Sequence, residues 1–225
     1  MKMTLNHGRT GLSGLRRAFA VTMLAVLWLT AACDEAPQQH AVLPEGSVVL
    51  AIGDSVTHGV GARSGADYPS QLAAISGWRV HNFGVSGDTS AGVRNRIAAA
   101  LEQVRPQLVI LEIGGNDFLR REPADKVKQN IRATIVRVKE EGIPLLLVAT
   151  PQFSPLGAAI GALSDAPLYA ELAQEENVAI VADVFAAVLS DNDLKSDPIH
   201  PNAEGYRRLA AGIAMALQRY GFLAP

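Results

Sequence analysis

The chain has 225 residues, enough for one globular domain with a full hydrophobic core. Its composition is ordinary for such a domain, with 48% hydrophobic and 19% charged residues and a formal net charge of −2. Removing the four basic residues that precede residue 33 from the 20 Lys and Arg leaves 16 against 22 acidic residues, a charge of −6. Nucleic-acid phosphates bind basic surfaces, so this balance argues against nucleic acid as a partner.

The first 32 residues have the composition of an export signal. They contain no Asp or Glu, carry basic residues up to Arg17, and continue with an apolar run over 18–29 that ends in small residues. The run is shorter than the roughly 20 residues that span a bilayer. We therefore expect a signal peptide over 1–32 that is cleaved, the alternative being an uncleaved anchor helix.

The single cysteine of the chain, Cys33, follows this leader directly. The five residues that end at it, Leu-Thr-Ala-Ala-Cys, resemble the lipobox of bacterial lipoproteins, whose cysteine is lipidated and becomes the mature N-terminus. A lone cysteine in an exported chain cannot form an internal disulfide, and lipidation gives it a role. The polar stretch behind it, with two Pro and two Gln, predicts a flexible tether over 33–46. The resemblance implies a protein of the bacterial cell envelope, periplasmic and lipid-anchored to a membrane.

From residue 47 to 225 strand patterns alternate with helical ones, which predicts one domain. Apolar runs predict five strands, at 47–52, 78–83, 108–113, 144–149 and 178–184. Helical periodicity predicts helices at 67–75, from 89 or 90 to Pro106, at 123–141, at 166–176, and through 206–217. In the first helix Tyr68, Leu72 and Ile75 are expected to share the buried face.

Strands that alternate with helices imply a parallel sheet covered on both faces. The predicted fold class is therefore α/β, with three α/β/α layers around a central five-stranded parallel sheet, as in flavodoxin-like folds. Polar loops follow the first, second, third and fifth strands, at the carboxyl edge where such sheets bind their ligands. One functional site at this edge is the simplest inference.

The chemistry at this edge begins with Ser55, on a glycine-bounded turn directly after the first strand. A serine hydroxyl is a weak nucleophile and needs a positioned base. The chain supplies a candidate base, His200, with Asp197 three residues before it. The prolines at 198 and 201 restrict the backbone there, and a turn ahead of a helix can place residues three apart side by side.

Four sequence blocks follow one another along the chain: Gly53-Asp54-Ser55, Asn82-x-Gly84-x-x-Gly87-Asp88-Thr89, Gly114-Gly115-Asn116-Asp117 and Asp197-x-x-His200-Pro201. Taken together and in this order, they resemble the blocks of the GDSL, or SGNH, hydrolases, and most closely their periplasmic thioesterase, lysophospholipase and arylesterase branch. The resemblance extends from about residue 47 to the C-terminus, with Val56 standing where the family name has Leu.

The resemblance implies a catalytic triad and an oxyanion hole. Ser55 would attack an acyl carbonyl, His200 would move the proton, and Asp197 would orient the imidazole. The Ser55 N–H, the Gly87 N–H and the Asn116 side-chain amide would hold the oxyanion. Gly87 is expected to let the backbone approach the substrate closely. The implied enzyme is a carboxylic ester hydrolase that would act on carboxylic esters or thioesters.

Each assignment has a simpler alternative. Ser55 could be only a helix cap, His200 a surface histidine, and Asn116 a turn residue. Further polar residues of the same loops are expected to have other roles. Asp54 and Asp117 would brace the loops as hydrogen-bond acceptors, and His58 would line the pocket. Asp191 and Asp193 are rivals of Asp197 as the partner of His200.

The substrate is the least defined part of the prediction. The small and apolar loop over 152–164 is expected either to line an acyl groove or to be an ordinary surface loop. The substrate would be a small acyl ester or a lipid, with no cofactor and no metal, and a monomer is the expected state. Competing functions are a polysaccharide or peptidoglycan O-acetyl esterase and a non-catalytic binding lipoprotein.

Overall fold

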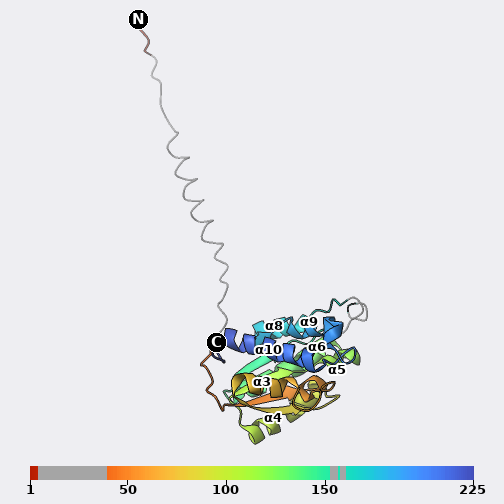
Figure 1. The fold of residues 1–225 in the computed structure, drawn as a ribbon. Coiled ribbons are helices and arrows are strands. Elements are labelled where there is room, and N and C mark those ends of the chain that lie inside the picture. Colours follow the sequence, from red (N-terminus) through yellow and green to blue (C-terminus); the bar gives the residue numbers. More distant parts are fainter. Residues whose placement is uncertain (5–39, 153–156, 158–160) are drawn as a thin grey trace. The chain divides into compact units, whose positions relative to one another are not determined.

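The computed structural model of the protein describes residues 1–4, 40–152, 157 and 161–225 (Figure 1). The chain divides into two units, Met1–Ala36 and Pro37–Pro225, and only the second has described secondary structure. The predicted signal peptide beyond residue 4, its cleavage site and Cys33 lie outside the described residues. Within the described part of the chain, no helix has the length and apolar content needed to cross a bilayer.

A five-stranded sheet, all parallel, forms the middle of the second unit and confirms the predicted fold class. The strand order is β2-β1-β3-β4-β5, so the chain reverses direction across the sheet after β2. Because β1 and β3 are adjacent and lead to opposite sides, the carboxyl end of β1 is the switch point where a ligand cleft is expected. The strands are β1 Val48–Gly53, β2 Arg79–Gly84, β3 Leu108–Glu112, β4 Leu145–Val148 and β5 Ala179–Val181.

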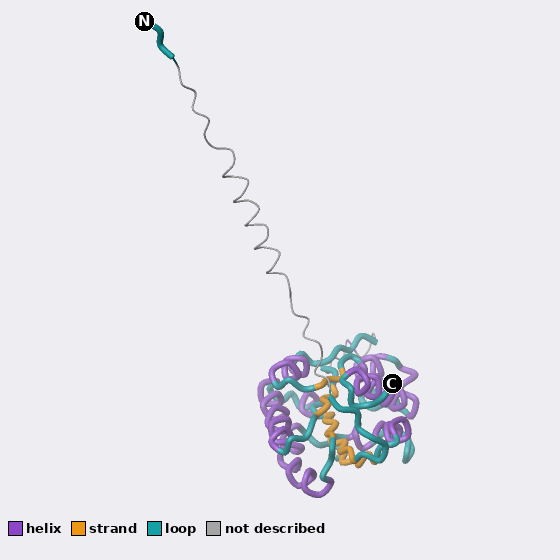
Figure 2. Tube along the Cα trace, turned by 90° about the vertical axis from the view of Figure 1, so that its left-hand side faces the viewer, coloured by secondary structure: helices purple, strands orange, loops and turns teal. Residues whose placement is uncertain are grey.

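Helices cover both faces of the sheet, which Figure 2 shows as purple tubes on either side of the orange strands. On one face the longer helices α3 Tyr68–Ser76, α9 Val184–Ser190 and α10 Ala203–Arg219 enclose one hydrophobic core. On the other face α4 Ser90–Val104, α6 Ala124–Glu140 and α8 Leu168–Glu175 enclose a second. Three short elements lie at the carboxyl edge: α2 Ser55–His58, α5 Gly115–Leu119 and the 3-10 helix η1 Asn192–Leu194.

The structure corrects the sequence prediction in several details. Residues 115–119, expected to be a loop, form α5, and the last predicted strand stops at Val181 because α9 begins at Val184. Ile75 is 50% exposed, so the apolar face of α3 consists of Tyr68 and Leu72 without it. The buried stripes of α6 and α10 match the periodicity of the sequence along both helices.

Residues 40–46 are bound to the domain, so the tether predicted over 33–46 is too long at its C-terminal end. The His40 and Leu43 N–H groups donate to the carbonyls of Tyr220 and Phe222, over 2.9 and 2.8 Å. The His40 ring stacks on that of Phe222 with centroids 4.1 Å apart. The segment therefore joins the C-terminal residues at the amino edge of the sheet, where β1 begins.

Candidate active site

The end of β1 places Ser55 at the carboxyl edge of the sheet. Gly53 is tightly enclosed there: a Cβ at this position would lie 2.1 Å from the Glu112 carbonyl oxygen, so any larger residue would force the strands apart. Asp54 then caps α2 by accepting from the Val56 N–H over 3.0 Å. The cap is thus Asp54 and not Ser55, which leaves the serine hydroxyl available for other contacts.

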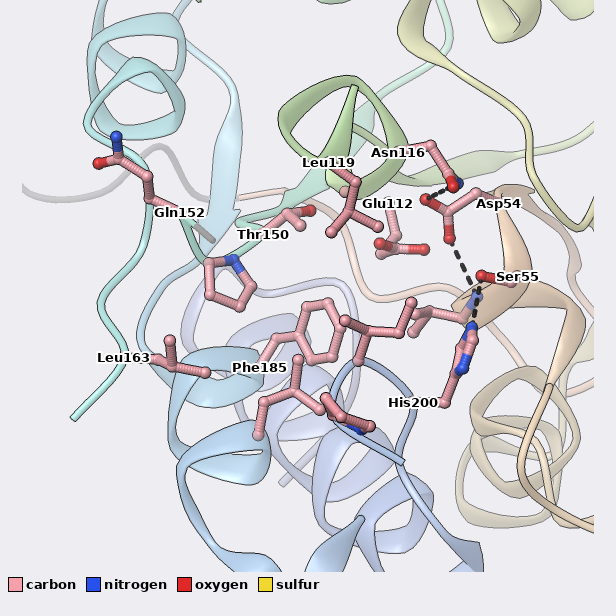
Figure 3. Close-up of a pocket in the computed structure, with 16 residues that line it drawn as sticks. Asp54, Ser55, Glu112, Asn116, Leu119, Thr150, Gln152, Leu163, Phe185 and His200 are labelled. Atoms are coloured by element: carbon pink, nitrogen blue, oxygen red, sulfur yellow. Dashed lines mark hydrogen bonds between the residues drawn. The ribbon is translucent and has the colours of Figure 1, made fainter. Parts of the chain in front are cut away.

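The structure brings Ser55, His200 and Asp197 into one hydrogen-bonded line. Ser55 Oγ and His200 Nε2 are 2.9 Å apart, the contact dashed in Figure 3, and His200 Nδ1 and Asp197 Oδ2 are 2.7 Å apart. Ser55 is buried and the His200 side chain is only 13% exposed, while the Asp197 side chain is 44% exposed. These distances suit transfer of the serine proton to the imidazole.

The turn that carries Asp197 explains the spacing of three. The other carboxylate oxygen of Asp197, Oδ1, accepts from the backbone N–H groups of Ile199 and His200, at 2.9 Å each. These two bonds fold the chain so that His200 lies beside Asp197. Partial burial opposes ionisation, but the hydrogen bond from His200 and those backbone N–H groups together lower the pKa of Asp197 below its ordinary value. Asp197 therefore stays a carboxylate beside the imidazole.

The rival residues Asp191 and Asp193 take part in other hydrogen bonds. Asp191 caps η1 by accepting from the Asp193 N–H over 2.9 Å, and the Asp193 carbonyl accepts from the Asn202 side chain over 2.7 Å. Asn202 in turn caps α10, which begins directly after the His200 turn. These bonds hold the loop in place, and the partner of His200 is Asp197.

Two of the three predicted oxyanion donors line the pocket. Ser55 and Asn116 do, whereas Gly87 is exposed and is not among the lining residues. The Asn116 amide nitrogen donates to the Asp88 carbonyl over 2.9 Å and to Asp54 Oδ2 over 3.3 Å. Gly87 has a φ of +81° and open space where a Cβ would be, so the turn conformation, and not a close approach, requires glycine there.

Asp54 and Asp117 have the bracing role expected of them. Asp117 accepts from the Ser90 N–H and hydroxyl over 2.8 and 2.7 Å, which ties α5 to the start of α4. Asp54 is almost fully buried behind the nucleophile. Burial raises the pKa of Asp54 to about 6, against the opposing influences of its hydrogen bond from Val56 and of nearby His200.

This raised pKa predicts a pH-dependent stability. A carboxyl whose folded pKa lies above its unfolded value stabilises the fold below about pH 4, and that contribution is lost as the pH rises through about 6. A shift from 3.8 to about 6 corresponds to about 3 kcal/mol. We expect the unfolding free energy of the wild type, measured in urea, to fall by about this amount relative to Asp54→Asn between pH 4 and 7. Parallel pH profiles for the two proteins would contradict the assignment.

Arg96 is a positioning residue that sequence reasoning missed. Its guanidinium donates to the Gly53 carbonyl, the Phe83 carbonyl and the Asp88 carboxylate, each over 2.8 Å. It thereby fixes the ends of β1 and β2 and the loop that holds Gly87. The helical pattern places Arg96 on the polar face of α4, where an arginine is usually solvated. Only its contacts with Phe83 and Asp88, in the Asn82–Thr89 block, distinguish it from such a residue.

The pocket beside Ser55 encloses about 560 Å³ of space, part of it open to solvent (Figure 3). Its apolar walls come from α5, α9 and the His200 loop, and the residues concerned are Leu119, Phe185, Leu189, Pro198 and Ile199.

Gln152 and Leu163 of the loop predicted over 152–164 also line the pocket, while 153–156 and 158–160 lie outside the described residues. His58 is exposed and does not line the pocket, contrary to expectation. Within the described ranges, no cluster of three or more His, Cys, Asp or Glu could hold a metal ion.

A serine hydroxyl, an imidazole and a carboxylate in line beside an apolar pocket, at the switch point of a parallel sheet, define a serine hydrolase. The sequence profile of the GDSL-like lipase/acylhydrolase family matches residues 51–208. The chain belongs to this family and is an ester hydrolase.

Curated relatives and solved structures agree with this assignment. Esterase TesA of Pseudomonas aeruginosa is 31% identical over 174 residues, which are 73% of this chain and 85% of the relative. Thioesterase 1/protease 1/lysophospholipase L1 of Escherichia coli K12 is 30% identical over 175 residues, 76% of this chain and 83% of the relative. A crystal structure of TesA superposes with a TM-score of 0.67 at 28% identity, covering 76% of this chain and 98% of the other.

Proposed function

We propose that Ser55, His200 and Asp197 hydrolyse acyl esters through an acyl-enzyme. Ser55 Oγ attacks the carbonyl carbon while its proton passes to His200 Nε2, and the leaving alcohol or thiol then takes that proton. A water molecule, deprotonated by His200, next attacks the carbonyl carbon of the Ser55 ester; the bond from that carbon to Oγ breaks, His200 returns the proton to Oγ, and the carboxylic acid is released. The observation that carries this proposal is the 2.9 Å contact between the serine and imidazole side chains.

The developing oxyanion would be held by the Ser55 N–H and the Asn116 amide, with Gly87 as the third donor. The longer of the two Asn116 bonds, at 3.3 Å to Asp54, is the one to be exchanged for the oxyanion. Arg120 donates to the Gly87 carbonyl over 3.0 Å and holds that residue near α5. A shift of this exposed loop toward Ser55 would complete the oxyanion hole.

The substrates are carboxylic esters or thioesters of modest acyl length. The apolar pocket walls support this, as do the names of the relatives, which include an esterase and a thioesterase. A panel of p-nitrophenyl esters from acetate to decanoate would define the acyl length. Turnover confined to acetates, with deacetylation of acetylated xylan, would instead indicate an O-acetyl esterase.

The test of the nucleophile is labelling by a fluorophosphonate probe, which reacts with activated serines. We expect the wild-type protein to be labelled and Ser55→Ala to be refractory. Ser76→Ala is the matched control, because the Ser76 hydroxyl, at the end of α3, donates to the Leu72 carbonyl, accepts from the Trp78 N–H and does not line the pocket. A wild-type protein that is not labelled by the probe would refute the proposed mechanism and would favour a non-catalytic binding lipoprotein.

We further propose that Cys33 is lipidated and anchors the enzyme in the bacterial cell envelope, on its periplasmic side. The lipobox resemblance supports this, and residues 34–39 would then link the lipid to the bound segment that starts at His40. Cys33→Ser is expected to move the protein from the membrane fraction to the soluble fraction after cell fractionation. Retention of that variant in membranes would indicate an uncleaved anchor helix instead.

A further inference from the structure

Ser55 and His200 meet although 145 residues of sequence separate them. Figure 3 shows their side chains approaching from ribbons of different colours, which belong to early and late parts of the chain. A misplacement of about 1 Å in an active site can cost on the order of 100-fold in rate. Contacts outside the pocket that join the segment behind Ser55 to the segment of His200 therefore bear on catalysis.

The peptide group of Val60 links the nucleophile to the last helix. Its N–H donates to the Ser55 carbonyl over 3.0 Å, where α2 ends. Its carbonyl accepts from the Tyr206 hydroxyl over 2.7 Å. Tyr206 is fully buried in the first turn of α10, and this helix begins at Ala203, three residues after His200. One peptide group thus connects the backbone of the nucleophile to the helix that follows the base.

Gly61 provides a second link, directly against the turn that carries His200. A Cβ at position 61 would lie 2.1 Å from Ser196 Oγ and 2.5 Å from the Pro201 carbonyl oxygen, so a larger residue would push this turn away. Ser196 is part of the same turn, because its N–H and its hydroxyl donate to the His200 carbonyl over 3.0 and 3.2 Å. The loop after α2 therefore packs on the residues that bracket Asp197 and His200.

We propose that Tyr206 and Gly61 are positioning residues that hold the His200 imidazole at proton-transfer distance from Ser55. This inference deepens the proposed function and rests on it. Neither residue lines the pocket, so losing either link should slow the proton transfers and leave substrate binding unchanged. The imidazole also protonates the leaving group, so the loss should be larger for a leaving group that needs this proton more.

The first test is Tyr206→Phe, which removes the hydroxyl and keeps the buried ring. Active sites are counted by fluorophosphonate titration. We expect kcat/KM for p-nitrophenyl butyrate to fall about tenfold through kcat, with KM within about twofold of the wild type. For ethyl butyrate, whose leaving group is a much stronger base, kcat/KM should fall at least about threefold further. A loss of folded protein would instead lower both activities by one factor.

Thr134→Val is the control for the lost hydroxyl, because Thr134 is equally buried but donates within α6, to the Asn130 carbonyl. Both of its rates should stay close to the wild-type rates.

Gly61→Ala and Gly65→Ala test the second link as a matched pair. Both glycines are exposed residues of the loop after α2 and have a positive φ, +94° and +80°, so alanine strains the backbone at each. Only at position 61 does the new Cβ collide with the His200 turn, because at 65 nothing lies within 4 Å. We expect Gly61→Ala to reproduce the kinetic pattern of Tyr206→Phe and Gly65→Ala to keep wild-type kinetics. If Tyr206→Phe does not fold, this pair decides alone.

Wild-type kinetics in Tyr206→Phe, or a loss of the same factor for the two esters, would overturn the positioning role. Equal effects of Gly61→Ala and Gly65→Ala would overturn it as well. Fluorophosphonate labelling of the wild type separates these results from failure of the proposed function, because a labelled wild type keeps the catalytic serine and refutes only the two links.

Discussion

Replacing His200 with alanine is expected to lower kcat for a p-nitrophenyl ester on the order of 10⁵-fold. Without the imidazole, Ser55 keeps its proton and attacks as a neutral hydroxyl, and the leaving group departs without a proton donor. The structure gives Ser55 a direct contact with one base, at 2.9 Å, so another histidine is not placed to substitute. Steady-state kinetics, with active protein counted by mass, measure the loss.

The double variant Ser55→Ala/His200→Ala sharpens this prediction. Residues that act as a unit have strongly non-additive effects, so the double variant should be about as slow as either single one. His81→Ala is the control, because His81 is an exposed residue of β2. Multiplicative losses in the double variant, or a comparable loss in His81→Ala, would mean that Ser55 and His200 do not act together.

The second large effect is expected for Asn116→Ala, with kcat lowered about 100- to 1,000-fold and KM little changed. The amide is near Ser55, and its stabilising bond is needed most when the carbonyl oxygen becomes an oxyanion. The same change removes its bonds to the Asp88 carbonyl and to Asp54. Some loss of stability will accompany the loss of rate, so melting temperature is measured beside kcat.

Asn130→Ala separates the two effects. Asn130 is a buried asparagine that also joins distant elements, donating to Ser90 Oγ over 3.0 Å and accepting from Arg94 over 2.8 Å, but it does not line the pocket. Its loss should lower the melting temperature and leave kcat within a few-fold. If Asn116→Ala behaved like Asn130→Ala, the amide would have a purely structural role.

The sheet and its covering helices could be predicted from sequence because buried positions are apolar and recur with the period of the strand or helix. Strands covered on both faces are continuous apolar runs, and long helices such as α6 and α10 show a repeating apolar stripe. Short helices leave no such pattern. Gly115 and Asn116 are turn formers, so the sequence predicts a loop where α5 lies, and α9 begins directly after Asp183, which has a positive φ of 63°.

The site divides in the same way. Ser55, Asp197 and His200 could be predicted because they lie in loops at the carboxyl edge of the sheet. Ligands bind at this edge, and core packing does not require these residue types there. The apolar run over 108–113 predicts a strand and gives Glu112 no role, although a lone carboxylate in such a run is a signal that it has one. Its environment depends on a hydrogen bond from Thr57 of α2 and on the nearby charge of Asp54, and one sequence does not show such pairings.

The attachment of residues 40–46 to the C-terminal end of the chain bears on how a secreted or recombinant version should be designed. The Trp78 indole donates to the Leu43 carbonyl over 3.3 Å, and the Gly46 N–H to the Gly77 carbonyl over 2.9 Å, so this strap also closes the start of β1. A truncation that begins at residue 47 would uncover Phe222 and Trp78 together. An expression boundary upstream of His40 keeps residues 40–46 packed against the C-terminal residues.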